Sequence, residues 1–415
     1  MIVLTNIRAT DENNQASVIA DIKSDSFGDD KIWFSVPVKQ QHYLTVNRYD
    51  AFLVALLYPA MRYGEDIHIA GAISKKLHRN ILTYVQAVLT AYSPSLKRIK
   101  ITADSFSEEK TVTAAGIGTG FSGGVDSFCT IYDHFVLEKD ERCRINTLIF
   151  LNVGSHGLYS NPDTENKFLK RYEYLHEFPK SVNLAFIKVN SNIHKFHEEF
   201  GHQKTCTLTT ASGILALQGT ISKYYISSAI SYSEMMSFGK FSKDFDITEY
   251  SDPYLLPLLG TESIEFIADG QQYSRTEKTI HIAEYEPVKK YLNVCINGER
   301  LDAGNCSFCP KCLRTIMTLE SAGVLAEFQD VFDISIYREH AFRYQCLQLL
   351  KYKTDVFAKD NIDFARGNGK WLPSYFVAAV LFCMPRMIMT GMRRVGRKLL
   401  DMEKYNKLKH WLRHR

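Results

Sequence analysis

The chain has 415 residues, too many for one ordinary domain, and its 45% hydrophobic and 12% aromatic residues exclude a mainly disordered protein. Its net charge of +4 excludes a surface that is basic throughout, as in a general nucleic-acid binder. The charge is uneven, however. Residues 386–415 contain ten Lys or Arg and two Asp or Glu, which leaves the rest of the chain at about −4.

The cellular compartment is predicted from the N-terminus and the cysteines. Residues 1–6 lack the basic start and long apolar segment of a secretory signal, so we expect a cytoplasmic protein. The chain has nine cysteines, and four of them lie close together between residues 295 and 312. In a reducing compartment, such clustering favours a metal site over disulfides.

Residues 1–110 predict an N-terminal accessory domain of the α+β class. Segments 17–22 and 31–38 have the composition of strands, while segments 50–61 and 72–92 have the apolar spacing of helices. No group of catalytic residues occurs among them. We therefore expect this domain to recognise a substrate or a partner.

Residues 111–325 alternate between strand and helix patterns. Strands are expected at 112–120, 147–153, 184–189 and 224–230, with helices at 166–178 and 205–218 between them. This order predicts an α/β, Rossmann-like domain with a parallel sheet and right-handed crossovers. Ligands of such sheets bind beyond the carboxyl ends of the strands.

Residues 326–415 predict a helical C-terminal extension. Segment 372–384 is apolar but, at thirteen residues, too short to span a membrane. A basic amphipathic helix then follows, with an apolar stripe formed by Met392, Val395, Leu399, Met402, Leu408 and Trp411. Such a helix can bind nucleic acid, an anionic membrane or the protein's own body, and we expect it to pack against the protein's own body.

The segment Ser122-Gly123-Gly124-Val125-Asp126-Ser127 follows the first strand of the parallel sheet and begins a helix. Adjacent glycines allow positive φ angles and a close approach of a phosphate to the backbone. Amides of the first helical turn and the helix dipole then favour an anion. Ser122 and Ser127 offer hydroxyl donors, and Asp126 can bind Mg²⁺ or order the turn. The alternative is a glycine turn that only caps a helix.

Two cations between the glycine segment and the cysteines are further candidates. Arg275 and Lys278 lie about one helical turn apart, so that both could neutralise the negative charge of a phosphate group held by the glycine segment. The alternative is an exposed helix start in which Glu277 balances them.

The four clustered cysteines have the spacing Cys295-x10-Cys306-x2-Cys309-x2-Cys312. Four thiolates with two C-x-x-C steps suit a tetrahedral Zn²⁺. With four protein ligands there is no open position, so the metal would be structural. The alternative is a set of buried free thiols.

Together, these motifs resemble a known family. The segment Ser122–Ser127 resembles the pyrophosphate loop of the N-type ATP pyrophosphatases, the PP-loop superfamily. With Cys295-Ile296-Asn297-Gly298 and the Cys306–Cys312 segment, the chain is similar over residues 112–320 to 7-cyano-7-deazaguanine synthase and its relatives. This resemblance implies a PP-loop domain of the adenine nucleotide alpha hydrolase type. It also implies ATP, Mg²⁺ and Zn²⁺ as cofactors.

The activity that the resemblance implies is cleavage of ATP to AMP and pyrophosphate. The enzyme would adenylate a carboxylate, such as 7-carboxy-7-deazaguanine or a related acid, for attack by ammonia or an amine. Segment Ser122–Ser127, Val125 included, would bind the nucleotide, and Asp126, Ser127, Arg275 and Lys278 would act in catalysis. Because the chain adds residues on both sides of the family region, the acceptor is open between a small-molecule carboxylate and a protein terminus.

Two other functions remain open from the sequence. One is a tRNA-modifying enzyme of the same superfamily, of the thiolation or lysidine type, with the basic tail contacting RNA. The other is a non-catalytic ATP-binding component of a bacterial defence or polysaccharide system. A homo-oligomer is compatible with any of them.

Overall fold

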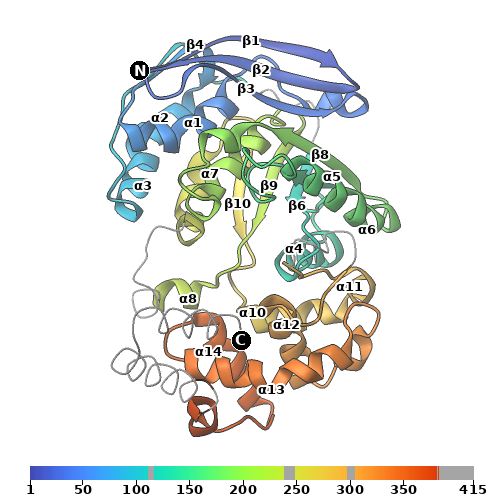
Figure 1. Cartoon of the computed structure of the whole chain (residues 1–415). Coiled ribbons are helices and arrows are strands. Elements are labelled where there is room, and N and C mark those ends of the chain that lie inside the picture. Colours follow the sequence, from blue (N-terminus) through green and yellow to red (C-terminus); the bar gives the residue numbers. More distant parts are fainter. Residues whose placement is uncertain (111–115, 238–247, 297–303, 381, 383–415) are drawn as a thin grey trace, which may run out of the picture. The chain divides into compact units, whose positions relative to one another are not determined.

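The computed structural model describes residues 1–110, 116–237, 248–296, 304–380 and 382. The chain divides into two compact units, residues 1–306 and residues 307–415 (Figure 1). The sequence predicted three parts, with boundaries near residues 110 and 325. The difference arises because the first 110 residues share both a sheet and a hydrophobic core with the segment that follows them.

A ten-stranded sheet organises the first unit, in the order β10-β9-β6-β7-β8-β3-β2-β1-β4-β5. Its strands are β1 (Ile2–Glu12), β2 (Gln15–Ser24), β3 (Gly28–Pro37), β4 (Ile67–Ser74), β5 (Ile101–Ser107), β6 (Gly116–Gly120), β7 (Thr147–Leu151), β8 (Ala185–Ser191), β9 (Ile221–Ser227) and β10 (Glu265–Asp269). Neighbours from β10 to β8 are all parallel, as are β1, β4 and β5. The predicted α/β class with a mostly parallel sheet is therefore confirmed.

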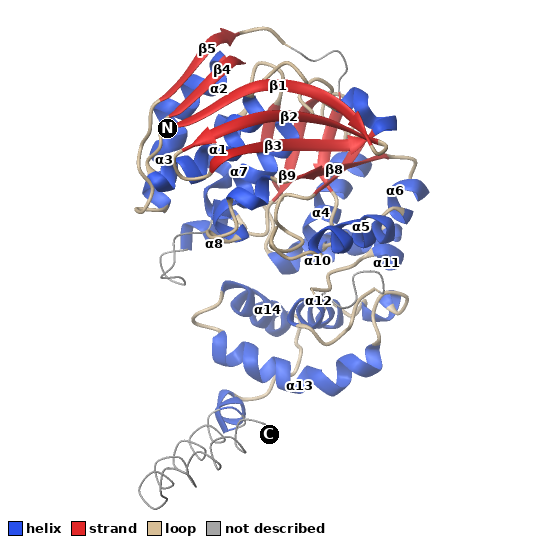
Figure 2. Cartoon of the chain, turned by 45° about the horizontal axis from the view of Figure 1, so that its top comes forward, coloured by secondary structure: helices blue, strands red, loops and turns tan. Residues whose placement is uncertain are grey.

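The N-terminal strands join the parallel sheet through one short antiparallel pairing. Phe34 and Ser35 of β3 pair with Ser191 and Asn190 of β8. Beyond this pairing, β3, β2 and β1 form an antiparallel meander, which Figure 2 shows as three long neighbouring strands. The sequence predicted β2 and β3 but not β1, β4, β5 or β10.

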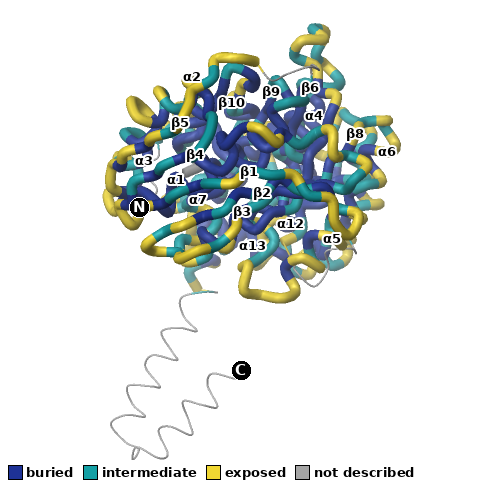
Figure 3. Tube along the Cα trace, turned by 90° about the horizontal axis from the view of Figure 1, so that it is seen from above, coloured by how far each residue is buried: buried dark blue, intermediate teal, exposed yellow. Residues whose placement is uncertain are grey.

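Helices of the first unit are α1 (Asp50–Tyr63), α2 (Lys75–Asn80), α3 (Gln86–Tyr92), α4 (Val125–Ile131), α5 (Thr164–Leu175), α6 (Glu177–Ser181), α7 (His202–Leu215), α8 (Tyr232–Ser237), α9 (Asp252–Leu255), α10 (Arg275–His281) and α11 (Glu286–Tyr291). The packing of α1 against α7 explains the shared core. Residues 50–61 of α1 are all buried, and Figure 3 draws the buried residues in dark blue. Most of these α1 residues belong to one hydrophobic cluster that includes side chains from both halves of the sheet.

The second unit contains α12 (Pro310–Ser321), α13 (Ile334–Lys351) and α14 (Val356–Gly367). Asp333 and Asp355 cap α13 and α14, each accepting hydrogen bonds from two backbone amides of the first turn. Asn361 of α14 donates a 2.8 Å hydrogen bond to Thr318 of α12, which ties these two helices.

No helix in the described part of the chain combines the length and apolar character needed to cross a membrane. The basic amphipathic helix expected around residues 392–411 lies outside the described residues, as do residues 112–115 of the first expected parallel strand.

Candidate functional site: a glycine loop beside two buried cations

The glycine segment joins β6 to α4 at the carboxyl end of a strand flanked by β9 and β7. Phe121, only 2% exposed, fixes its start by packing on Phe128 and Phe178, with ring centroids 5.3 and 4.9 Å away. The loop therefore stands on a rigid aromatic base at the edge where parallel sheets bind ligands.

Gly123 has a φ of +76°, the left-handed region that glycine enters without strain. A Cβ atom there would lie 2.7 Å from Cδ2 of Leu175, so the position also lacks space for a side chain. Gly124 differs, because its φ of −85° suits any residue and a Cβ would meet only Ser122 Oγ, at 3.4 Å. Ser127 Oγ donates to the Gly124 carbonyl at 3.0 Å. Of the two glycines, only Gly123 is required by the backbone.

Two residues that the sequence did not single out hold the loop from outside. Arg171 of α5 donates to the Ser122 carbonyl at 2.8 Å and to Asn293 Oδ1 at 3.1 Å. The backbone N–H of Asn293 donates to the Gly123 carbonyl at 2.7 Å. Because these bonds use the loop's carbonyl oxygens, they set its carbonyls towards the protein. No motif surrounds either residue, so only the structure could identify them.

Asp126 is the meeting point of the predicted catalytic residues. Arg275 forms a hydrogen-bonded ion pair with its Oδ2, and Lys278 Nζ lies 3.5 Å from Oδ1. The side chains of Arg275 and Lys278 are 6% and 1% exposed, against 23% for Asp126. The structure thus brings together residues that lie about 150 positions apart, and places both cations beside the loop.

Local folding explains how α10 presents the cations. Ser274 and Glu277 form a capping box at the start of α10, which fixes the first turn after β10. Arg275 and Lys278 are then three positions apart on one helical face. Lys278 Nζ also donates to the carbonyl of Ser228, just after β9. The predicted alternative of an exposed helix start does not describe these side chains, which are buried.

A second layer of acid and histidine pairs fixes α4 and the π-helix that continues it (η3, Tyr132–Leu137). Asp269, at the end of β10, accepts from Thr130 Oγ1 at 2.6 Å and lies 2.8 Å from His134 Nε2. Burial by itself would raise the pKa of Asp269. The pKa is nevertheless lowered overall, because the carboxylate is stabilised by its hydrogen bond with His134, by the charge of His134 and by its hydrogen bond from Thr130. Asp133 pairs in the same way with His281 of α10, at 2.6 Å.

His156, which follows β7, packs as a neutral aromatic side chain. Its ring contacts Phe150 and Phe168 at centroid distances of 5.0 and 5.3 Å. Burial, with a smaller contribution from the charge of Arg171, lowers the pKa of His156 to about 3. A histidine that stays neutral at physiological pH cannot supply positive charge to a phosphate.

The four cysteine ligands predicted for a metal also converge. The Sγ atoms of Cys295, Cys306, Cys309 and Cys312 all lie within 4.8 Å of one another, and Cys295 alone is partly exposed. Tetrahedral Zn²⁺ with bonds of about 2.3 Å needs sulfur atoms about 3.8 Å apart, so the cluster fits the ion after a small contraction. Cys309 and Cys312 lie at the N-terminal end of α12, where the helix dipole favours thiolates.

Searches of protein-family models, curated proteins and solved structures found no match to this chain. The resemblance to the PP-loop superfamily therefore stays a prediction, and the functional argument depends on the geometry of the loop and its cations.

Proposed function

We propose that the chain binds ATP with Mg²⁺ at Ser122–Ser127, cleaves it between the α- and β-phosphates, and activates a carboxylate. The observation that carries this proposal is the burial of Arg275 and Lys278 beside a glycine loop at the carboxyl edge of a parallel sheet. Two fixed cations there suit a group on which negative charge develops.

Each predicted residue has a role in this reaction. A carboxylate oxygen of the acceptor attacks the α-phosphorus, the bond to the β-phosphate oxygen breaks, and pyrophosphate leaves with the electron pair. The loop amides and the hydroxyls of Ser122 and Ser127 bind the phosphates, while Arg275 and Lys278 stabilise the leaving group. Ammonia or an amine then attacks the acyl adenylate, forming an amide and releasing AMP.

Asp126 has two functions in this proposal. Without nucleotide, its carboxylate pairs with Arg275 and Lys278 and holds both side chains beside the loop. When the phosphates share those cations, the carboxylate becomes available to Mg²⁺, which prefers oxygen ligands and supplies charge stabilisation to the phosphates. The four-cysteine cluster binds Zn²⁺ as a structural ion and takes no part in the chemistry.

The test is to incubate the full chain with ATP, Mg²⁺ and pools of small carboxylic acids or peptides, with and without ammonium. Release of AMP and pyrophosphate that depends on an acid supports the proposal; release of ADP and phosphate would overturn it. Lys278→Met should lose this activity. Lys290→Met changes a cation on α11 that the proposal leaves without a role, and should keep it.

A further inference from the structure

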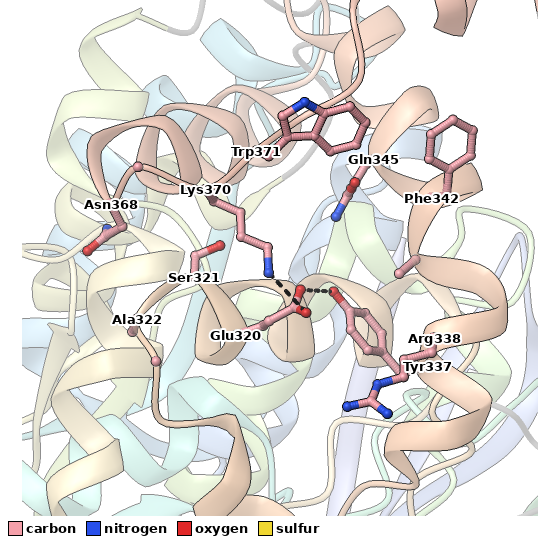
Figure 4. A pocket seen from close by; sticks show the side chains of 13 residues that line it. Glu320, Ser321, Ala322, Tyr337, Arg338, Phe342, Gln345, Asn368, Lys370 and Trp371 are labelled. Atoms are coloured by element: carbon pink, nitrogen blue, oxygen red, sulfur yellow. Dashed lines mark hydrogen bonds and ion pairs between the residues drawn. The ribbon is translucent and has the colours of Figure 1, made fainter.

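A groove of about 820 Å³ crosses the second unit (Figure 4). It is lined by the end of α12 and the turn after it, by one face of α13, and by the turn that follows α14. None of these elements belongs to the ATP site proposed above, so the groove requires a separate explanation.

The charged groups on the floor of the groove are paired with one another. Glu320 accepts a hydrogen bond from the Tyr337 hydroxyl at 2.7 Å and forms an ion pair with Lys370 at 3.0 Å, as the dashed lines in Figure 4 show. Gly369, with φ +68°, ends α14 and turns the chain so that Lys370 and Trp371 reach the groove. The floor thus offers little net charge to a ligand.

The walls present two large rings to solvent. The side chains of Trp371 and Phe342 are 71% and 45% exposed, although both line the groove. Gln345 lies between them and points into the groove (Figure 4). The residue is only 7% exposed, and its side-chain amide makes no hydrogen bond within the described residues. The side chain is thus mostly covered while its amide faces the groove, where it can both donate to and accept from a ligand.

We propose that this groove binds an unpaired nucleobase. A base stacks on Trp371 or Phe342, and its polar edge pairs with the Gln345 amide, which can donate and accept at once as glutamine does with adenine. Arg338 lies on the exposed rim and has no carboxylate partner within the described residues, so it is available to a phosphate of the nucleotide that carries the base. An apolar peptide side chain would cover the rings but leave the Gln345 amide unpaired.

The base could come from a free nucleotide or from a single strand, and two probes separate these sources. The first is a short fluorescein-labelled oligoadenylate strand, whose anisotropy is measured with the full chain at fixed salt. The second is AMP, followed by quenching of Trp371 in a variant with Trp33→Phe and Trp411→Phe, which leaves Trp371 as the remaining tryptophan of three. Because only Trp371 reports, AMP bound at the proposed ATP site does not interfere.

We expect Trp371→Ala to weaken binding by about tenfold, while Phe376→Ala, an equally exposed aromatic that does not line the groove, leaves it unchanged. Gln345→Leu should alter the preference for adenine over uracil strands. Gln348→Leu, the same change outside the lining of the groove, should not.

Quenching by AMP in the same concentration range as strand binding identifies a nucleotide site, and binding of the strand alone identifies a single-strand site. Equal affinity of Trp371→Ala and wild type for both probes would overturn the proposal. So would a tryptophan-containing peptide that binds through Trp371 while neither nucleotide probe does. Asp126→Asn should not change Trp371 quenching, so failure of the proposed ATP reaction is distinguishable from failure of this site.

Discussion

Replacing Asp126 by alanine removes the shared partner of two buried cations. Removing one partner of a buried ion pair costs about 3–5 kcal/mol, because the remaining charge is left without compensation. Here the cation side chains are 6% and 1% exposed, but Asp126 is 23% exposed, so water can partly replace its carboxylate. We therefore expect a loss at the lower end, about 3 kcal/mol in the free energy of unfolding.

Urea unfolding of wild type and Asp126→Ala measures this loss. Asp163→Ala serves as the control, because Asp163 pairs with Lys167 on the surface at 3.3 Å and should contribute little. Millimolar pyrophosphate should stabilise Asp126→Ala more than wild type, because its cations no longer have a carboxylate partner. An Asp126→Ala protein as stable as wild type would refute the account of the buried cations. Unchanged AMP release by this variant would refute the proposed role of Asp126 in the reaction.

Three further predictions test the loop, the metal and the pH response. Gly123→Ala should destabilise the protein by about 1–3 kcal/mol, because of its positive φ and the contact with Leu175, whereas Gly124→Ala should not; equal thermal melts would contradict this. Mass spectrometry should find about one zinc ion per wild-type chain, and Cys309→Ser should lower this content. Cys346→Ser, which changes a buried cysteine outside the cluster, should retain the zinc. Burial lowers the pKa of His197 to about 4, so below pH 6.5 the unfolded chain takes up the proton first. This histidine alone should lower the free energy of unfolding by about 1.4 kcal/mol per pH unit from pH 6.5 to 4, and His197→Gln should reduce the measured slope by that amount.

The sequence determined the local features of this protein. Strand and helix patterns between residues 147 and 230 predicted β7, α5, β8, α7 and β9 within a few residues, because hydrophobic periodicity reports which face of an element is buried. Spacing alone also predicted that the four cysteines between residues 295 and 312 would form one cluster. The turn at Gly123 follows from a conformation that glycine adopts most easily.

Only the tertiary structure decided how distant segments combine. The pairing of Phe34 with Ser191 merges the N-terminal strands into the parallel sheet, although the two residues lie far apart in sequence. Arg171 holds the loop from a helix without any motif, and Asp126 meets Arg275 across 149 positions. Periodicity and turn chemistry act over a few residues, whereas strand order and buried ion pairs depend on which surfaces meet when the chain packs. Those contacts have no local signature, and they decide what surrounds the glycine loop.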